Sequence, residues 1–285
     1  MKSRILIAIC SSHKYEARRR AVRKTWLQRL PRGMQAVFIV GKGQWLDEED
    51  VVQLPVDDKF VRLPVKIQSF FRHALAHYDF DFLFKCDDDT YLHTERLLTL
   101  PVKGVEFIGS DCDNHRSVAQ GGAGYLLSRR AVGLVANILP YYGRSEDTWV
   151  SYAVQREGIP LHFSARLKKD HLDYPRMGND LITAHRCSTQ FMRLIDEGIE
   201  KPGATDVFQF YMVQHTHWVG PLKLLRNGVF LSRSGGLSGR WEMRDHDETL
   251  VLNWNHWPAT RLKKTATGYG NLKYRLDLLE TASSM

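Results

Sequence analysis

The sequence predicts an α/β protein in which a sheet flanked by helices is followed by a small antiparallel β module. Through about residue 198, short apolar runs alternate with stretches of helical spacing, which is typical of an α/β layer with a largely parallel sheet. Beyond it, short alternating segments are separated by turn residues, as in an antiparallel module. Since 285 residues exceed a typical domain, we expect one domain over residues 1–198 and a β-rich module over 199–285.

The first strand is expected at Ile5–Cys10, where six apolar residues follow a basic start. This run is too short for the core of a signal peptide and far too short to span a bilayer, so it indicates a buried strand. A helix is expected over Tyr15–Leu30, because Ala21, Val22 and Trp26 recur near one face.

The remaining elements of the first domain follow the same alternation. Apolar or β-branched runs predict strands at 35–41, 51–55, 82–84, 105–109 and 123–127. Apolar residues at helical spacing predict helices at 64–77, 128–139 and 146–155. Because strands and helices alternate, the strands are expected to share one sheet on which the helices pack.

The second part of the chain is expected to be antiparallel. Its strands are predicted at 208–213, 222–225, 229–231 and 250–254, and Asn227-Gly228 between two of them is a strong hairpin signal. Four tryptophans lie in this part: Trp218, Trp241, Trp254 and Trp257. They indicate either a surface on which a glycan stacks or packing in the core and against the main domain.

Three consecutive aspartates, Asp87, Asp88 and Asp89, follow the apolar run at 82–84 and are the most informative feature of the sequence. Ligands of open α/β sheets bind where strands end, and a divalent metal relieves the repulsion between adjacent carboxylates. A solvated acidic turn is the alternative that the spacing alone leaves open. The buried run before the triplet favours the metal site.

The composition is that of a soluble globular protein, with 43% hydrophobic and 25% charged residues. The net charge of +8 favours an anionic partner: the phosphates of a nucleotide sugar, an acidic glycan or an anionic membrane surface. Nucleic acid is not expected, since the sequence has no zinc-finger spacing, no aromatic RNA-binding signature and no long basic tail. The four cysteines are scattered without a CxxC pair, which indicates reduced thiols of a cytosolic protein rather than disulfides.

Several motifs occur in a fixed order along the first domain. They are RRRAVRKTW at 18–26, FIVG at 38–41, DKFVRLPVK at 58–66, the triplet at 87–89, QGGAGYLLS at 120–128, EDT at 146–148 and DLITAH at 180–185 followed by Met192. In this order they resemble family 31 glycosyltransferases, the β1,3-galactosyl- and N-acetylglucosaminyltransferases that include the Fringe proteins. Phe60 and Ala123 depart from the family's tyrosine and glycine. The resemblance covers roughly Ile5 to Glu197, and the module after Gly198 lies outside it.

The resemblance implies a GT-A-type, Rossmann-like fold with a metal-dependent active site. Asp89 is the implied direct ligand of Mn²⁺ or Mg²⁺, while Asp87 and Asp88 contact ribose, donor sugar or metal-bound water. His185 is the implied second ligand, and manganese accepts such mixed oxygen and imidazole ligands. His171 remains its rival, because Fringe-like members have their histidine at about that shorter spacing from the preceding acidic motif.

Asp147 is the implied catalytic base, since an inverting transfer needs a base on the face of the sugar opposite the leaving diphosphate. Its position at the start of a helix, where Ser145 can cap, would keep the carboxylate ionised. Without the family, an ordinary acidic first turn is the alternative. Gly121, Gly122 and Gly124 would permit close backbone approach to donor and acceptor, although a turn explains glycines equally well.

The resemblance implies inverting transfer of a hexose, galactose first and N-acetylglucosamine next, from a UDP-sugar to a hydroxyl of a glycan or lipid-linked glycan. The product would be a β1,3 linkage in polysaccharide or glycoconjugate synthesis. Alternatives are a catalytically inactive carbohydrate-binding protein and a metal-dependent phosphohydrolase or nucleotidyltransferase. Arg19 and Arg23, four residues apart, either hold the sheet or reach the diphosphate. With no signal peptide or transmembrane segment in the sequence, we expect a bacterial-type cytoplasmic enzyme, peripheral to the inner membrane through its basic surface.

Overall fold

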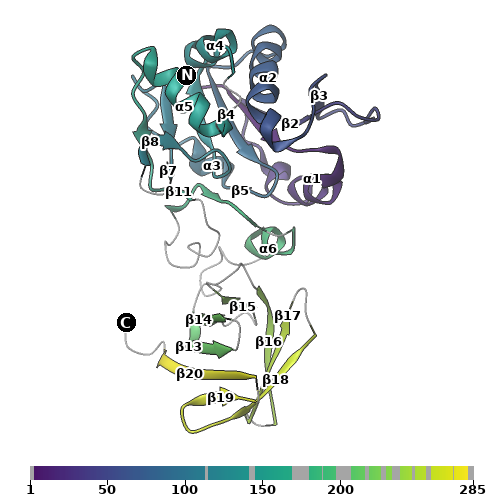
Figure 1. Cartoon of the computed structure of the whole chain (residues 1–285), viewed down its shortest axis with the longest axis vertical. Coiled ribbons are helices and arrows are strands. Elements are labelled where there is room, and N and C mark those ends of the chain that lie inside the picture. The colour runs from purple at the N-terminus through teal and green to yellow at the C-terminus, as the bar shows by residue number, and fades with distance from the viewer. Residues whose placement is uncertain are drawn as a thin grey trace. The chain divides into compact units, whose positions relative to one another are not determined.

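The computed structural model describes residues 3–112, 115–140, 145–168, 180–187, 189–196, 207–215, 218–225, 229–232, 238–245, 248–254, 258–271 and 273–281. The chain forms two compact units, Met1–Arg193 and Leu194–Met285. This division falls a few residues before the boundary expected at residue 198. Figure 1 shows the helices and strands of each unit.

The first unit is built on one mixed sheet whose described strands lie in the order β10-β6-β9-β4-β1-β2-β3. They are β1 (Ile5–Cys10), β2 (Met34–Val40), β3 (Val51–Gln53), β4 (Phe82–Asp87), β6 (Phe107–Gly109), β9 (Tyr125–Ser128) and β10 (His162–Phe163). β1 is parallel to β2 and β4, whereas β9 is antiparallel to β4 and β6. The predicted α/β class, a mixed sheet flanked by helices, is confirmed.

Helices alternate with the strands of this unit along the chain, as the sequence predicts (Figure 1). They are α1 (Glu16–Arg23), α2 (Leu63–His77), α3 (Thr94–Leu97), α4 (Arg129–Asn137), α5 (Glu146–Arg156) and α6 (Thr189–Leu194). α2, α4 and α5 contact one another and share a core cluster with β1, to which they contribute Phe70, Val132 and Val150. All six residues of β1 are buried, so both faces of the sheet are covered at its centre.

The helix expected over Tyr15–Leu30 is shorter than predicted. It ends at Arg23, between the 3₁₀ turns η1 (His13–Tyr15) and η2 (Trp26–Arg29). Thr25 leaves the helical region, with φ −121° and ψ −118°, and its hydroxyl donates back to the carbonyls of the last helical turn. This break turns Trp26 into the interior, where its indole N–H donates to the carbonyl of Thr90 at 3.1 Å. A third 3₁₀ turn, η3 (Phe60–Arg62), leads into α2.

One edge of the sheet collects the ends of several elements. β1, β2 and β4 run parallel, so Ser11, Gly41 and Asp87 lie at their common carboxyl edge. β9 runs the opposite way and therefore begins at this edge, directly after the glycine segment at 121–124. Ligands bind at such an edge in open α/β sheets.

Two small sheets lie beside the main one. β11 (Leu167–Lys168) pairs parallel with β12 (Thr183–Ala184), and β12 pairs antiparallel with β5 (Tyr91–Leu92), just after the aspartate triplet. β7 (Asp111–Cys112) pairs antiparallel with β8 (His115–Ala119). The first of these sheets brings the segment around His185 next to the triplet.

The second unit is a closed antiparallel barrel. Its strands are β13 (Val207–His215), β14 (Trp218–Leu225), β15 (Val229–Ser232), β16 (Ser238–Arg244), β17 (Thr249–Trp254), β18 (Thr260–Lys264), β19 (Gly268–Gly270) and β20 (Tyr274–Thr281). The predicted antiparallel module is confirmed, and β14 and β15 pair across the predicted Asn227-Gly228 turn, which itself lies outside the described residues.

The barrel interior is apolar. Its core includes Leu222, Phe230 and Trp254, and Trp241 packs against it. Trp254 therefore follows the core-packing interpretation of the tryptophans. The side chains of Trp218 and Trp257 lie outside the described residues.

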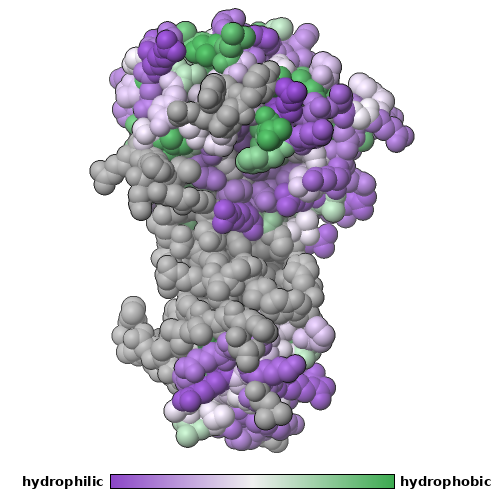
Figure 2. Space-filling model, in the orientation of Figure 1, coloured by the Kyte–Doolittle hydropathy of each residue, from purple (hydrophilic) through white to green (hydrophobic). Residues whose placement is uncertain are grey.

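Hydrophilic residues dominate the face drawn in Figure 2, and the apolar side chains on it form separate patches rather than one continuous area. In the described part of the chain, no helix combines the length and the apolar character needed to cross a bilayer. Cys10, Cys86 and Cys187 are buried free thiols, as expected, and the side chain of Cys112 lies outside the described residues.

Candidate active site

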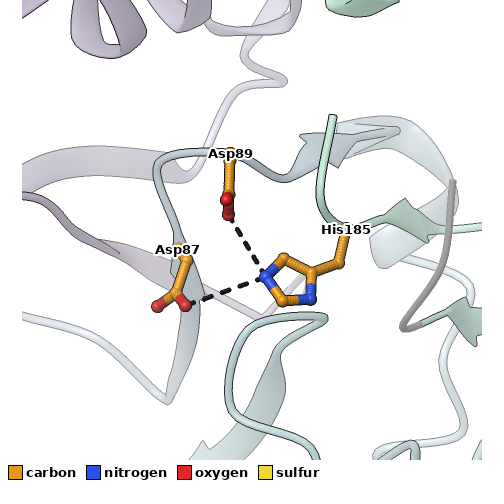
Figure 3. Close-up of side chains that lie close together, drawn as sticks. All are labelled: Asp87, Asp89 and His185. Carbon is orange, nitrogen blue, oxygen red and sulfur yellow. Dashed lines mark ion pairs between the residues drawn. The ribbon is translucent and has the colours of Figure 1, made fainter. Parts of the chain in front are cut away.

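Two aspartates of the triplet and one histidine face one another at the carboxyl edge of the sheet (Figure 3). Nε2 of His185 lies 3.2 Å from Oδ1 of Asp89 and 3.8 Å from Oδ2 of Asp87. One potential ligand atom from each of the three side chains lies within 4.8 Å of the others. The structure thus brings together Asp87, Asp89 and His185, residues that are distant in the sequence.

Backbone pairing fixes this arrangement. In the small sheet, Ala184 pairs with Tyr91 and Thr183 with Leu92. The amide of Cys187 donates to the carbonyl of Asp89 at 2.8 Å, closing the loop that carries His185 against the triplet. The histidine is therefore positioned by main-chain bonds on both sides of it.

The cluster fits a divalent cation. Oδ1 of Asp89 is a buried polar atom without a hydrogen-bond partner, and it lies 3.2 Å from Nε2 of His185. Although burial opposes ionisation of Asp89, His185 and Arg18 outweigh it and lower the pKa of this carboxyl below its usual value. Two carboxylates and an imidazole form the mixed oxygen and nitrogen donor set that Mn²⁺ accepts.

Asp88 points away from this cluster. Its Oδ2 accepts a hydrogen bond from Oγ of Ser11 at 2.7 Å, and its Oδ1 accepts one from Arg18 at 3.0 Å. Burial raises the pKa of Asp88 to about 6 against the opposing effect of these two donors. Both oxygens of Asp88 are thus held by hydrogen bonds from the protein itself.

Arg18 is a site residue that the sequence analysis missed. Besides Asp88, its guanidinium contacts Oδ2 of Asp89 at 3.2 Å and lies over the ring of Tyr15, 4.2 Å from the centroid. Arg19 and Arg23, which were singled out instead, bind Glu48, which favours a structural role for that pair. The run of three arginines signalled a basic cluster, but only the fold selects the member that reaches the triplet.

The three glycines of the 121–124 segment are accounted for by contacts within the protein. A Cβ on Gly122 would lie 2.1 Å from Cε1 of His185, and one on Gly121 would lie 3.0 Å from Cβ of Asp147. Gly124 has φ +104°, and a Cβ there would lie 2.3 Å from the ring of Phe84. Neighbouring glycines therefore touch the histidine of the cluster on one side and the predicted base on the other.

Asp147 lies half-buried in the first turn of α5. Its Oδ2 accepts a hydrogen bond from the amide of Gly121 at 3.2 Å, and its Oδ1 accepts one from the amide of Thr148 at 2.8 Å. Ser145 occupies the N-cap position but makes no capping bond to the backbone; its hydroxyl pairs with that of Thr148. The carboxylate is thus held by two backbone amides, and the side-chain cap expected from Ser145 is not formed.

The neighbouring Glu146 is buried and fully engaged. The hydroxyl of Tyr125 donates to its Oε1, and Nζ of Lys85 donates to its Oε2 at 3.1 Å. Burial raises the pKa of Glu146 above its usual value. Of the two acidic residues that begin α5, only Asp147 is accessible to a substrate.

A second group of polar atoms lies at the ends of β1 and β2. Oδ1 of Asp58 accepts hydrogen bonds from the amide of Gly41 at 2.8 Å and from the buried Lys66, which also donates to the carbonyl of Ser11. Its Oδ2 is buried without a hydrogen-bond partner, and so is Oγ of Ser12. This group was also missed by the sequence analysis, although Asp58 and Lys66 delimit one of its motifs.

His171, the alternative to His185 as the second metal ligand, lies outside the described residues.

The geometry is accompanied by sequence similarity to known proteins. Residues 17–121 match the family model for galactosyltransferases. The chain is 32% identical over 119 residues to the "Probable beta-1,3-galactosyltransferase 13" of Arabidopsis thaliana, an alignment that covers 34% of this chain and 34% of the relative. It is 35% identical over 103 residues to the "Probable beta-1,3-galactosyltransferase 12" of the same plant, with 29% and 28% covered. The matched part thus spans about a third of the length of these relatives. For this segment, the resemblance predicted from the motifs is confirmed.

Two solved structures have weakly similar folds. A mannosyltransferase from Pyrobaculum calidifontis in complex with GDP-mannose and Mn²⁺ gives a TM-score of 0.42 at 11% identity, with 61% of this chain and 60% of that chain covered. A glycosyltransferase involved in glycosylation of the major capsid of PBCV-1 gives 0.43 at 13% identity, with 66% and 98% covered.

Proposed function

Because residues 17–121 carry a galactosyltransferase segment, we propose that the chain transfers a hexose, galactose first, from a UDP-sugar to a glycan hydroxyl. The transfer inverts the anomeric centre, depends on a divalent cation and forms a β1,3 linkage. The observation that carries this proposal is the contact of two adjacent glycines: Gly122 touches His185, and Gly121 touches Asp147. A cation site and a potential base therefore flank one backbone segment, as a group transfer between two substrates requires.

Asp87, Asp89 and His185 would hold the cation. When bound, Mn²⁺ would supply positive charge that stabilises the negative charge developing on the leaving diphosphate. Arg18, in contact with Asp89, adds a fixed positive charge next to the same position. In the described part of the chain this is the one cluster of three such ligands, which favours a single-metal transferase over a two-metal phosphohydrolase.

Asp147 would act as the base that accepts the proton of the acceptor hydroxyl. Its two oxygens accept hydrogen bonds from backbone N–H groups, and it is not one of the three cluster residues. Glu146 cannot take this role, since it is buried and its oxygens are held by Lys85 and Tyr125. A base separate from the cation site is the arrangement that direct displacement with inversion needs.

The nucleoside would bind at the ends of β1 and β2. Oδ2 of Asp58 and Oγ of Ser12 are buried there without partners. An unpartnered buried acceptor costs free energy unless a ligand donates to it. The imide N–H of uracil is one such donor, and the proposed UDP-sugar would supply it.

A donor panel with the purified chain tests the proposal. We expect UDP release from UDP-galactose in the presence of Mn²⁺, faster when a glycan acceptor is added, and a β1,3-linked product by NMR. Equal turnover in excess chelator would contradict the metal dependence. Preference for a nucleotide other than UDP would contradict the donor assignment, and release of free phosphate would favour the phosphohydrolase alternative.

A further inference from the structure

The ammonium group of Lys85 joins three parts of the proposed active site. Lys85 lies in β4 with its side chain 3% exposed. Its Nζ donates to Oδ1 of Asp87 at 2.9 Å, to Oε2 of Glu146 at 3.1 Å and to the carbonyl of Gly121 at 3.2 Å. An ammonium has three N–H groups, so its donors are fully used by these partners.

Each partner orients a residue of the site. With Oδ1 of Asp87 held by Lys85, the other oxygen of this carboxylate faces His185 at 3.8 Å. Gly121, whose carbonyl accepts from Lys85, donates its amide to Asp147. The lysine therefore contacts one cluster residue directly and reaches the predicted base through a single residue, Gly121.

The third partner fixes the start of α5. Glu146 is the first residue of this helix and directly precedes Asp147. Its second oxygen accepts from the hydroxyl of Tyr125, the first residue of β9. Lys85 and Tyr125 thus tie the helix that carries Asp147 to two neighbouring strands of the sheet.

The free energy of folding alone gives little reason to bury the ion pair of Lys85 and Glu146. Desolvation of two buried charges can exceed their attraction, and neutral side chains of similar volume often replace a buried ion pair without loss of stability. Orientation of two carboxylates on different elements is a role that neutral side chains would not fill.

We propose that Lys85 is a positioning residue that sets Asp87 and Asp147 relative to one another through its bonds to Asp87, Gly121 and Glu146. This inference rests on the proposed function for its effect on turnover. The positioning itself can be measured without turnover, because the amide of Gly121 is hydrogen-bonded to Asp147.

The test uses the full chain carrying the double substitution Lys85→Met and Glu146→Gln, which removes both charges of this ion pair together, so that neither is left buried without the other. Tyr125→Phe is the milder second variant, since it removes one donor to Glu146 and keeps the ring. Arg129→Met is the control: Arg129 donates to the carbonyls of Tyr78 and Leu75 and has no contact with the site residues. Any general loss of stability should appear in this control as well.

Amide exchange is the first readout. We expect exchange in the segments 119–124 and 145–149 to accelerate about tenfold in the double variant, the effect of one lost hydrogen bond, and less in Tyr125→Phe. In Arg129→Met, faster exchange should stay near residues 75–80. Unchanged exchange at 119–124 and 145–149 in the double variant would overturn the proposal.

Turnover is the second readout. Misplacement by about 1 Å costs on the order of 10²-fold in kcat, and KM for the donor should change far less. Because Lys85 acts through Asp147 and Asp87, its loss should cost little further activity in an Asp147→Asn background. An equal loss of activity from the Lys85 substitution in the wild-type and the Asp147→Asn backgrounds would show a structural role only. A wild-type chain without transferase activity would contradict the proposed function, whereas the exchange experiment would still decide the positioning.

Discussion

A Cβ on Gly122 would lie 2.1 Å from Cε1 of His185, which leaves no room for any other residue beside this ring. The glycine cannot move away, because its carbonyl accepts a hydrogen bond from Oγ1 of Thr90 at 2.7 Å. In Gly122→Ala the imidazole must therefore turn out of the cluster. We expect Mn²⁺ affinity, measured by calorimetric titration, to fall by about 10-fold or more. Gly133→Ala, in α4 with nothing near the added methyl, should leave it unchanged.

The cation site itself is tested by removing its ligands. Asp89→Ala and His185→Ala should each weaken Mn²⁺ binding by at least about 10²-fold, and UDP binding should weaken only when the metal is present, because the lost group acts through the cation. His171→Ala is the comparison that decides between the two histidines. If His171→Ala loses the metal and His185→Ala retains it, the assignment of the second ligand is wrong.

Asp147→Asn keeps the shape of the side chain but cannot accept a proton. We expect kcat to fall by about 10²–10⁴-fold while the affinities for UDP and Mn²⁺ stay nearly unchanged. Steady-state kinetics and titration on the same preparation give both quantities. Near-normal turnover, or an α-linked product from an α-linked donor, would remove the base and the inverting mechanism together.

Arg18 holds positive charge next to the carboxylates that would bind the cation. Its half-exposed ion pair with Asp89 is worth ~0.2–1 kcal/mol, so Arg18→Met should tighten Mn²⁺ binding by up to about fivefold through loss of a competing charge. Arg20→Met is a matched control on the same helix, since Arg20 pairs with the exposed Glu16. Weaker metal binding in Arg18→Met, measured by titration, would mean that the arginine supports the cation site instead.

Two histidines on α2, which are not residues of the proposed active site, predict that the free energy of unfolding depends on pH. The rings of His73 and His77 lie 4.3 Å apart between centroids, and burial together with the charge of His77 lowers the pKa of His73 below 6.5. The folded state then binds fewer protons than the unfolded state below about pH 6.5, so the free energy of unfolding rises with pH through that range and levels above it. Urea unfolding from about pH 5 to about pH 8 should show a flatter profile in His73→Gln. A profile as steep as that of the wild type would exclude this origin.

The strand ends could be predicted from the sequence because their signals are local. The aspartate triplet follows an apolar run, and the DLITAH motif supplied His185. The cation cluster follows once these two segments lie side by side. Lys85 and Arg18 were missed because their roles depend on contacts between strands and helices that no spacing encodes. A lysine in the middle of an apolar strand was itself a signal, since a buried ammonium must find partners. The helix expected over 15–30 was too long, because periodicity does not register a threonine whose hydroxyl bonds back to the preceding turn.

In the second unit, β13 pairs with both β14 and β20, which closes the ring of strands. Every strand of the ring therefore pairs with a strand on each side, and the described strands leave no edge strand. An open sheet offers such an edge to extended peptides, which can bind by adding a strand. Any partner of this unit would instead contact outward side chains and the connections between strands.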